Sequence, residues 1–228
     1  MDLCQFWMRN FMDPLRAFEH RLSPELFKSW HALTSPLAVQ AYLDSIPYVA
    51  VDLDRSPLQV LQDGQAHCLD GGLLAALALR RLGYRPLVLD LVPQAGTDDD
   101  HVLALFQSRG AWGAVAKSNY AGLRYRDPIY RNLHELAMSY FEHYFNQEKQ
   151  KTLRAYTRPL DLRPFDRFDW MWSEAGVVRI SRHLYRLKPV PLFPAAVIGR
   201  LSPVDERSFA ADTLGTNFDW VYGVRSKG

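Results

Sequence analysis

The spacing of hydrophobic residues changes twice along the chain and divides it into three parts. Up to about residue 85, apolar residues recur every three or four positions, as they do on one face of a helix. From there to about residue 119, apolar and polar residues alternate, which is typical of strands. From about residue 150, proline and aromatic residues are frequent and neither period is clear. The pattern predicts an α+β fold.

Three Ser-Pro pairs mark helix starts in the first part. Serine is a favoured N-cap, and proline fits the first helical position because its missing N–H would have no partner there. The pairs at 23–24, 35–36 and 56–57 predict two helices, over SPELFKSWHAL and SPLAVQAYLDSI, and a third short one after Ser56. Residues 1–22, which include Phe6 and Trp7, give an ambiguous pattern compatible with a short amphipathic helix.

The strongest predicted helix begins at Cys68, in HCLDGGLLAALALRRLGYRP. Its LLAALAL run is apolar on all sides, which indicates a helix buried in the centre of the domain. Gly83 predicts its C-terminal cap. Gly71 and Gly72 in its first turn each cost about 0.5–1 kcal/mol relative to alanine, so we expect a second backbone or a substrate to approach closely there.

The middle of the chain predicts a small sheet followed by a helix. PLVLDLVP reads as one strand, and HVLALFQ and WGAVAKSN form a hairpin around the turn SRGA. RDPIYRNLHELAMSYFEHYFNQ predicts a long helix with Asp127 as N-cap and Pro128 behind it. We expect a single domain over 1–228, with a core at about 23–147 and an irregular, Pro- and aromatic-rich part at 150–228 packed on it.

Composition narrows the function classes. The 228 residues are 48% hydrophobic and carry a net charge of +2 with no long block of either sign, so nothing favours nucleic acid or a membrane surface as partner. No secretory signal or apolar run long enough to cross a bilayer is seen. With only Cys4 and Cys68, we expect reduced thiols and a cytoplasmic protein. The sequence has no phosphate-binding glycine loop and no paired metal-ligand spacing, so we expect no cofactor and no metal.

The position of Cys68 suggests a nucleophile. The field at a helix N-terminus lowers the pKa of a thiol, and the free N–H groups there can bind the oxyanion formed when a thiolate attacks a carbonyl. A lone cysteine in a core helix is also commonly just a small buried hydrophobe, and this segment alone does not separate the two.

A catalytic thiol needs an imidazole partner. His67 is adjacent to Cys68, but neighbouring residues on a helix point about 100° apart, which makes a poor ion pair. His101 begins the second strand after the cysteine helix, directly after three aspartates that favour a protonated ring. We therefore expect His101 to be the partner.

The ordered set HCLDGGLLAALALRRLGYRPLVLDL and DDDHVLALFQSRGAWGAV resembles the transglutaminase-like superfamily of papain-like cysteine enzymes over about residues 55–130. Cys68 and His101 match the family's cysteine and histidine in order and spacing, and Trp112 matches a tryptophan that commonly opens the return strand. The resemblance implies a papain/transglutaminase-like fold: a central buried helix carrying the cysteine, packed on a small antiparallel sheet with helices around it.

The third family position departs from the pattern. The usual acid would fall near Lys117, where no carboxylate stands. Asn119 ranks first as the residue that orients His101, Asp127 second and Ser118 third. For the oxyanion, the resemblance implies the Cys68 N–H and, by analogy with a glutamine of papain-like proteases, the side chain of Gln62.

These residues predict a cysteine enzyme that cleaves or transfers an acyl group at an amide or peptide bond, with a peptide or protein as substrate. In this hypothesis Cys68 attacks the carbonyl, His101 moves the proton and Asn119 orients the ring. The alternative is an inactive transglutaminase-like domain that serves as a protein-binding or scaffolding module, which the missing aspartate favours.

Overall fold

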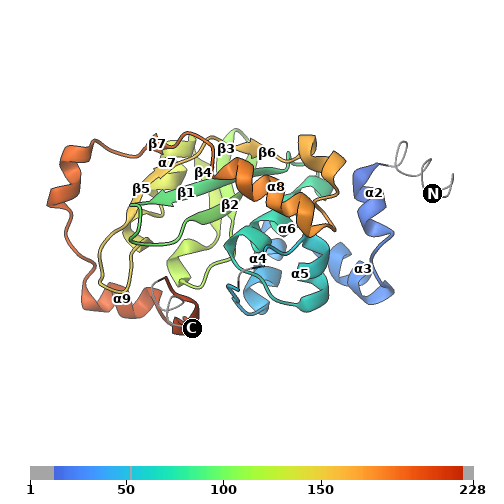
Figure 1. Cartoon of the computed structure of the whole chain (residues 1–228), viewed down its shortest axis with the longest axis horizontal. Helices are drawn as coiled ribbons and strands as arrows, with labels where there is room; N and C mark the ends of the chain where they lie inside the picture. The colour runs from blue at the N-terminus through green and yellow to red at the C-terminus, as the bar shows by residue number, and fades with distance from the viewer. Residues whose placement is uncertain (1–12, 52, 223–228) are drawn as a thin grey trace.

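The computed structural model describes residues 13–51 and 53–222. Cys4 and the ambiguous segment around Phe6 and Trp7 lie outside the described residues, apart from the end of that segment, which includes the short helix α2. The first part of the chain is helical (Figure 1), with the bounds α2 Pro14–Glu19, α3 Pro24–His31, α4 Pro36–Ser45, α5 Pro57–Asp63 and α6 Cys68–Arg81.

The three Ser-Pro helix starts are confirmed. Each serine has an extended backbone, and its hydroxyl accepts a hydrogen bond from the N–H three residues on, with proline at the first helical position. At Ser56 the side chain of Gln59 also reaches back to the Ser56 N–H at 2.8 Å, which completes a capping box. The caps fix where these helices begin.

The sheet is antiparallel throughout, with the order β4-β3-β2-β1-β5-β7 and β6 paired beside β5 on β1. The predicted strand and hairpin are confirmed as β1, β2 and β3. The bounds are β1 Leu87–Pro93, β2 His101–Ser108, β3 Ala111–Val115, β4 Arg126–Tyr130, β5 Leu153–Tyr156, β6 Leu160–Asp161 and β7 Val190–Pro191.

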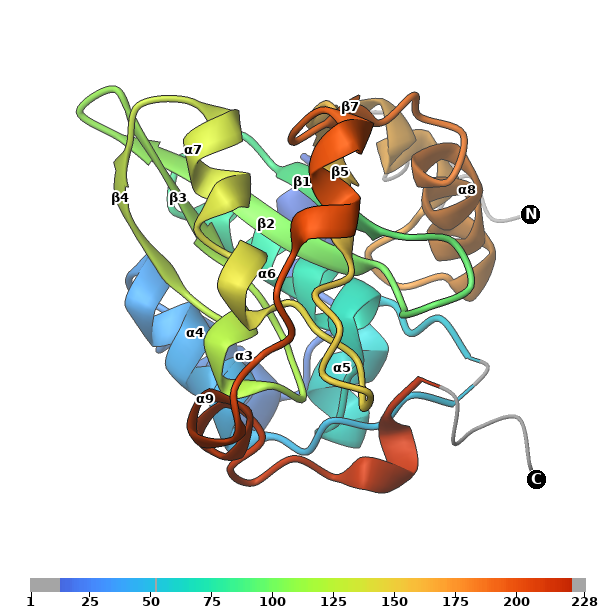
Figure 2. The ribbon, with the colours of Figure 1, turned by 90° about the vertical axis from the view of Figure 1, so that its left-hand side faces the viewer.

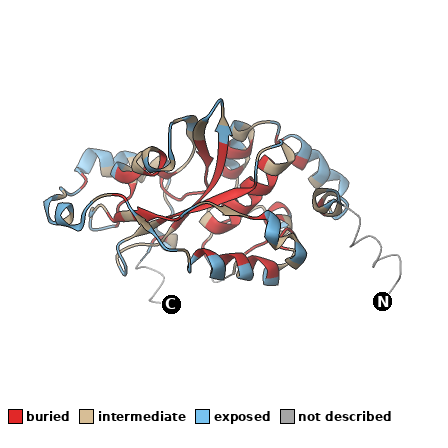
Figure 3. Cartoon of the chain, turned by 90° about the horizontal axis from the view of Figure 1, so that it is seen from above, coloured by how far each residue is buried: buried red, intermediate tan, exposed pale blue. Residues whose placement is uncertain are grey.

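Each face of the sheet has its own core. Val102, Ala104 and Phe106 of β2 pack with α6, whereas Leu103 and Leu105 belong to a second cluster on the other face. Figure 2 shows α6 crossing behind the sheet and α7 (Leu133–Met138) on the viewer's side. Burial is deepest along α6 and the central strands (Figure 3), as the sequence predicted for the helix that begins at Cys68. The fold is therefore α+β, with a small antiparallel sheet and several helices.

The long helix expected from Asp127 is wrong. Residues 126–130 are extended and pair with β3, in the register Trp112↔Tyr130 and Ala114↔Arg126, so Asp127 lies in an edge strand. Pro128 is tolerated there because an edge strand leaves one row of N–H groups unpaired. The helix α7 begins later, where the side chain of Asn132 accepts from the Glu135 N–H at 2.9 Å.

The C-terminal part holds more helix than the irregular pattern suggested. The amphipathic helix α8 spans Glu174–Leu184 and buries Val177, Ile180 and Leu184 in the core on the α6 side. The remaining elements are short: η1 Ala121–Leu123, η2 Phe141–His143, η3 Arg163–Phe168, η4 Ala195–Arg200, α9 Glu206–Asp212 and η5 Phe218–Trp220. None of the helices in the described part of the chain is long and apolar enough to span a membrane.

Candidate active site around Cys68

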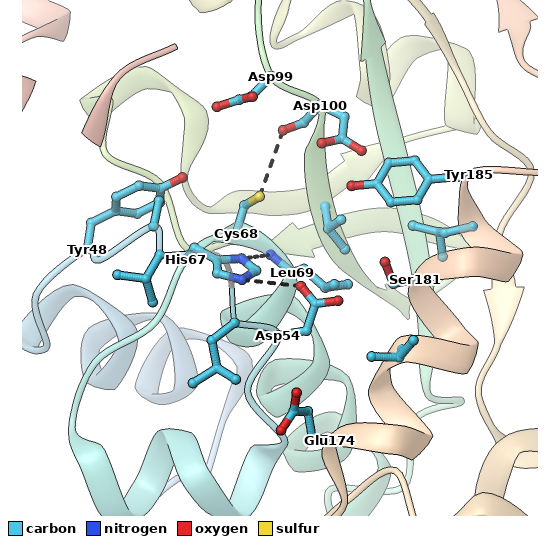
Figure 4. Close-up of a pocket in the computed structure, with 16 residues that line it drawn as sticks. Tyr48, Asp54, His67, Cys68, Leu69, Asp99, Asp100, Glu174, Ser181 and Tyr185 are labelled. Atoms are coloured by element: carbon cyan, nitrogen blue, oxygen red, sulfur yellow. Dashed lines mark hydrogen bonds and ion pairs between the residues drawn. The ribbon is translucent and has the colours of Figure 1, made fainter. Parts of the chain in front are cut away.

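Cys68 is the first residue of α6 and lines a cavity of about 330 Å³. Three segments form the walls: the residues before α5 at positions 48, 50, 51, 53 and 54, the residues before and at the start of β2, and one face of α8. Figure 4 shows the thiol pointing toward Asp100, with His67 beside it and Tyr185 reaching in from the end of α8. A reactive group at the start of a buried helix thus faces a space large enough for a small ligand or a side chain.

The residue before the cysteine supplies the imidazole of the cavity. His67 is the N-cap of α6, with an extended backbone (φ −97°, ψ −171°), so the 100° rule for helical neighbours does not apply to it. Its Nδ1 accepts from the Leu69 N–H at 3.2 Å. Its Nε2 lies 3.1 Å from a carboxylate oxygen of Asp70 and 3.6 Å from one of Asp54. The ring is therefore held between the helix start and two acids.

Asp70 is fully buried and anchors this arrangement. It accepts from the backbone N–H of Arg55 at 2.7 Å and of His67 at 3.2 Å, and the Arg55 guanidinium lies 3.5 Å away. Burial raises the pKa of Asp70 to about 6, although His67, the two backbone N–H groups and Arg55 counteract the shift. At neutral pH Asp70 is an anion that faces His67.

Two influences oppose each other at His67. Burial by itself would lower its pKa, but hydrogen bonding to Asp54 and Cys68 and the charge of Asp70 raise the pKa to about 10. An imidazolium carries hydrogen on both nitrogens, so protonation of Nδ1 breaks the hydrogen bond that Leu69 donates. The protonated ring thus leaves the Leu69 N–H free at the start of the helix.

The thiol is held in its neutral form. Burial raises the pKa of Cys68, and the carboxylate of Asp100 adds to the effect, while His67 and the Val102 N–H counteract it. The Sγ lies 3.8 Å from the backbone oxygen of Asp100, to which an S–H can donate. The lowered pKa expected for a thiol at a helix N-terminus does not result, because desolvation outweighs the favourable field.

The rest of the cavity is acidic. Asp54, Asp99, Asp100 and Glu174 line it, and no lysine or arginine is among its lining residues. Behind Asp100 lies the carboxyl of Asp90, which is 3% exposed; burial and the contact with Asp100 raise the pKa of Asp90 well above its usual range. Among the described residues, no group of three or more His, Cys, Asp or Glu side chains could hold a metal ion.

The two glycines of α6 admit the sheet. A Cβ on Gly71 would lie 2.3 Å from the Cβ of Lys117, and one on Gly72 would lie 2.9 Å from a methyl carbon of Val102. Both positions therefore need glycine so that the helix can pack directly on β2 and on the residues after β3. The close approach at these two glycines therefore comes from other segments of the same protein, which was the first of the two expected reasons, and not from a substrate.

His101 lies on the other face of the sheet. It is 4% exposed, its Nε2–H donates to the Leu123 carbonyl at 2.8 Å, and its ring packs edge-on against Tyr140 and Tyr144. Burial lowers the pKa of His101 to about 4. The hydrogen bond to Leu123 raises the pKa in part, and the charge of Arg126 lowers it further. The ring is neutral, and it does not line the Cys68 cavity.

The structure does not bring the other expected site residues to the thiol either. Asn119 forms a reciprocal pair with the backbone of Asn217, donating to its oxygen at 2.8 Å and accepting from its N–H at 3.0 Å. Gln62 is exposed on α5, and Ser118 accepts from the Tyr120 N–H. The catalytic roles given to these residues stay predictions.

Lys117, which stands where the family pattern has an acid, closes the end of α4. Its Nζ donates to the backbone oxygens of Leu43, at 2.8 Å, and Ile46. Burial lowers the pKa of Lys117 to about 8, and the charge of Arg124 adds to that effect. A lysine thus has a structural task at this position, since it satisfies carbonyls at the end of a helix.

Sequence reasoning missed His67, Asp54 and Asp70 as site residues. The signal for two of them is present: an N-cap residue followed three positions later by an acid is the spacing of a capping box, and the structure shows that box between His67 and Asp70. Asp54 lies in an irregular segment, and no local pattern indicates that it faces His67.

Comparisons with known proteins give little more. No family model matches the sequence, and no curated protein matches it. Among solved structures, the fold is similar to Legionella pneumophila LapG at 10% identity and a TM-score of 0.40, over 73% of this chain and 95% of that one. An EGTA-treated form of the same protein is similar at 13% identity and a TM-score of 0.34, over 46% of this chain and 68% of that one.

Proposed function

We propose that this protein is a transglutaminase-like, thiol-dependent enzyme that cleaves or transfers an acyl group at an amide or peptide bond, with Cys68 as nucleophile and His67 as its partner. One observation carries the proposal: a thiol at a helix start and a carboxylate-backed imidazole share one cavity. The papain-like sequence pattern around Cys68 supports the same chemistry. His67 takes the role that the sequence assigned to His101.

The first half-reaction uses the thiolate. Cys68 loses its proton to solvent, and the protonated His67 beside it stabilises the resulting negative charge. The thiolate attacks the substrate carbonyl, while the N–H groups of Cys68 and Leu69 at the start of α6 bind the oxyanion. The C–N bond then breaks, and His67 gives its proton to the leaving amine. The products are a thioester on Cys68 and a free amine.

The second half-reaction restores the enzyme. Neutral His67 takes a proton from water, the hydroxide attacks the thioester, and the acid is released with Cys68 again a thiolate and His67 again protonated. An amine in place of water gives acyl transfer. Asp54 and Asp70 hold the ring in place through both halves, as the third group of a catalytic triad does.

The experiment is to trap the acyl-enzyme. In a Cys4→Ser background, which leaves Cys68 as the single thiol, the protein is incubated with p-nitrophenyl acetate and its intact mass is followed with time. We expect one acetyl group on Cys68, none on Cys68→Ala, and acylation slower by about 10²-fold or more in His67→Asn. Asparagine removes the imidazole, while its side chain can cap the helix as neutral His67 does, which keeps the protein folded.

The second candidate, a binding module without catalysis, is favoured by one observation: burial keeps the Cys68 thiol protonated. A folded protein that neither accumulates an acyl-enzyme nor releases p-nitrophenol would contradict the enzyme and support the module. Acylation that persists unchanged in Cys68→Ala would also contradict the proposed site.

A further inference from the structure

A second concave site lies on the far side of α8 from Cys68. While Glu174, Ser181 and Tyr185 face the thiol cavity, a different stripe of the same helix faces a groove of about 510 Å³. β6 and η3 form the other wall of this groove. Arg179, Arg182 and His183 follow the i, i+3, i+4 spacing of one helix face, and Arg186 continues the row in the turn after α8.

Four guanidinium groups in this groove lack an acidic partner. Arg179, Arg182 and Arg186 come from the α8 side and Arg167 from η3, and none of them forms an ion pair within the described residues. Three nearby arginines are paired: Arg80 with Asp166, and Arg85 and Arg163 with Asp161. Four unpaired like charges repel one another, so their gathering in one groove favours an anionic ligand.

The aromatic floor holds two of these arginines in place. Arg167 and Arg179 lie on the ring of Phe168, with guanidinium carbons 4.7 Å and 4.5 Å from its centroid. Cation–π contact restrains the guanidinium plane and leaves its N–H edge available. Less side-chain freedom is then lost when a ligand binds.

At one end of the groove, arginines already bind a carboxylate of the protein itself. The Asp161 carboxylate accepts from Arg163, with Nη2 at 2.6 Å and Nε at 3.0 Å, and from Arg85 at 3.0 Å. Asp161 also accepts from the Arg163 N–H at 3.1 Å, so the start of η3 is occupied. An intramolecular carboxylate thus fills the position where a helix start could have taken a phosphate.

The same contacts argue against a nucleic acid. Binding of single strands relies on aromatic rings on which bases stack. Here Phe168 is covered by the two arginines, and Phe165 packs edge-on against His183 and partly into the core. The positive charges instead form a row along the end of α8: Arg179 and Arg182 lie on the helix, and Arg186 lies in the turn after it, on the order of 10 Å from Arg179 along the row.

We propose that this arginine groove, formed by Arg167, Arg179, Arg182 and Arg186, binds an acidic segment of a peptide or protein, with carboxylates paired along α8. Successive side chains on one face of an extended peptide lie about 7 Å apart, so two carboxylates match the length of the row. The proposal does not depend on Cys68 chemistry.

The test measures binding of a fluorescein-labelled hexaglutamate peptide by fluorescence anisotropy, with the Cys68→Ala protein used in parallel. We expect saturable binding that weakens as salt rises, equal in the wild type and in Cys68→Ala. The double variant Arg179→Glu/Arg182→Glu should bind at least tenfold more weakly. The double variant Arg200→Glu/Arg207→Glu, at two exposed arginines outside the groove, makes the same change in net charge and should bind like the wild type.

Three outcomes would overturn the proposal. The first is equal binding of a hexaglutamine peptide, which would show that carboxylates are not recognised. The second is equal loss of binding in Arg200→Glu/Arg207→Glu and in the groove variant, which would show a response to net charge alone. The third is a preference for phosphates. Labelled oligothymidylate would bind tenfold more tightly than labelled hexaglutamate, or the labelled peptide would be displaced by pyrophosphate but not by unlabelled hexaglutamate.

Discussion

The two faces of the sheet differ most at the start of β2, where consecutive residues point opposite ways. Asp100 and Val102 face α6: one lines the cavity beside the Cys68 thiol, and the other packs on Gly72. His101 between them turns its ring to the opposite face, against Tyr140 and Tyr144. The α6 face holds ionisable groups at a cavity, and the other face holds a neutral, enclosed imidazole.

The difference follows from the alternation of a strand. Side chains along a strand point to opposite faces in turn, so a shift of one residue exchanges a site residue for a core residue. His101 has the order and spacing of a catalytic histidine, but its register places it with the second core. The imidazole next to the thiol comes instead from His67, which precedes α6.

The largest expected effect on stability comes from a substitution that disrupts the packing on the α6 face of the sheet. In Gly71→Ala the new methyl would lie 2.3 Å from the Cβ of Lys117, an atom bonded directly to the backbone that cannot swing away as the end of a side chain can. We expect the free energy of unfolding, measured by urea denaturation, to fall by about 3 kcal/mol. The better helix propensity of alanine offsets only a part of the cost of the clash.

The matched control is Gly199→Ala, where an added Cβ meets nothing within 4 Å and φ is not positive. It should change the free energy of unfolding by no more than about 0.5 kcal/mol. Equal effects of the two substitutions would contradict the close contact between α6 and Lys117.

A smaller effect tests the other face. The pKa of His101 is about 4 in the folded protein and 6.5 in an exposed histidine, so the unfolded chain binds a proton first as the pH falls. His101 therefore makes the protein less stable as the pH drops from about 6.5 to about 4. Asp70, whose pKa is raised, works in the opposite sense and is the same in wild type and variant.

The difference between wild type and His101→Gln isolates this contribution. Urea unfolding at about pH 7 and about pH 5 should show wild-type stability falling more steeply than that of the variant, which has no proton to take up. The same fall in both proteins would mean that His101 is not held neutral by burial.

Local signals in the sequence were enough for much of the fold. The Ser-Pro caps, the apolar run of α6 and the alternation through β2 and β3 depend on neighbouring residues alone, and the structure has these elements where they were predicted. The edge strand β4 was missed because RDPIY satisfies the rules for a capped helix start, and only its pairing with β3 makes it extended.

The candidate site was harder to predict because it depends on contacts between distant segments. Asp54, Asp100 and Tyr185 reach the cavity from three segments, and α8 was not expected at all. The thiol's pKa was misjudged for a related reason: the helix field is local, whereas desolvation comes from everything packed around Cys68.

The pH dependence of Cys68 alkylation by iodoacetamide shows whether His67 or His101 is the imidazole of the Cys68 site. The rate is measured in the Cys4→Ser background. The wild-type thiol should titrate above the ordinary value of about 8.5, because burial raises its pKa. His67→Asn should shift that midpoint further up, since the imidazole favours the thiolate, and His101→Gln should leave it in place. A midpoint that moves in His101→Gln and stays in His67→Asn would contradict the account.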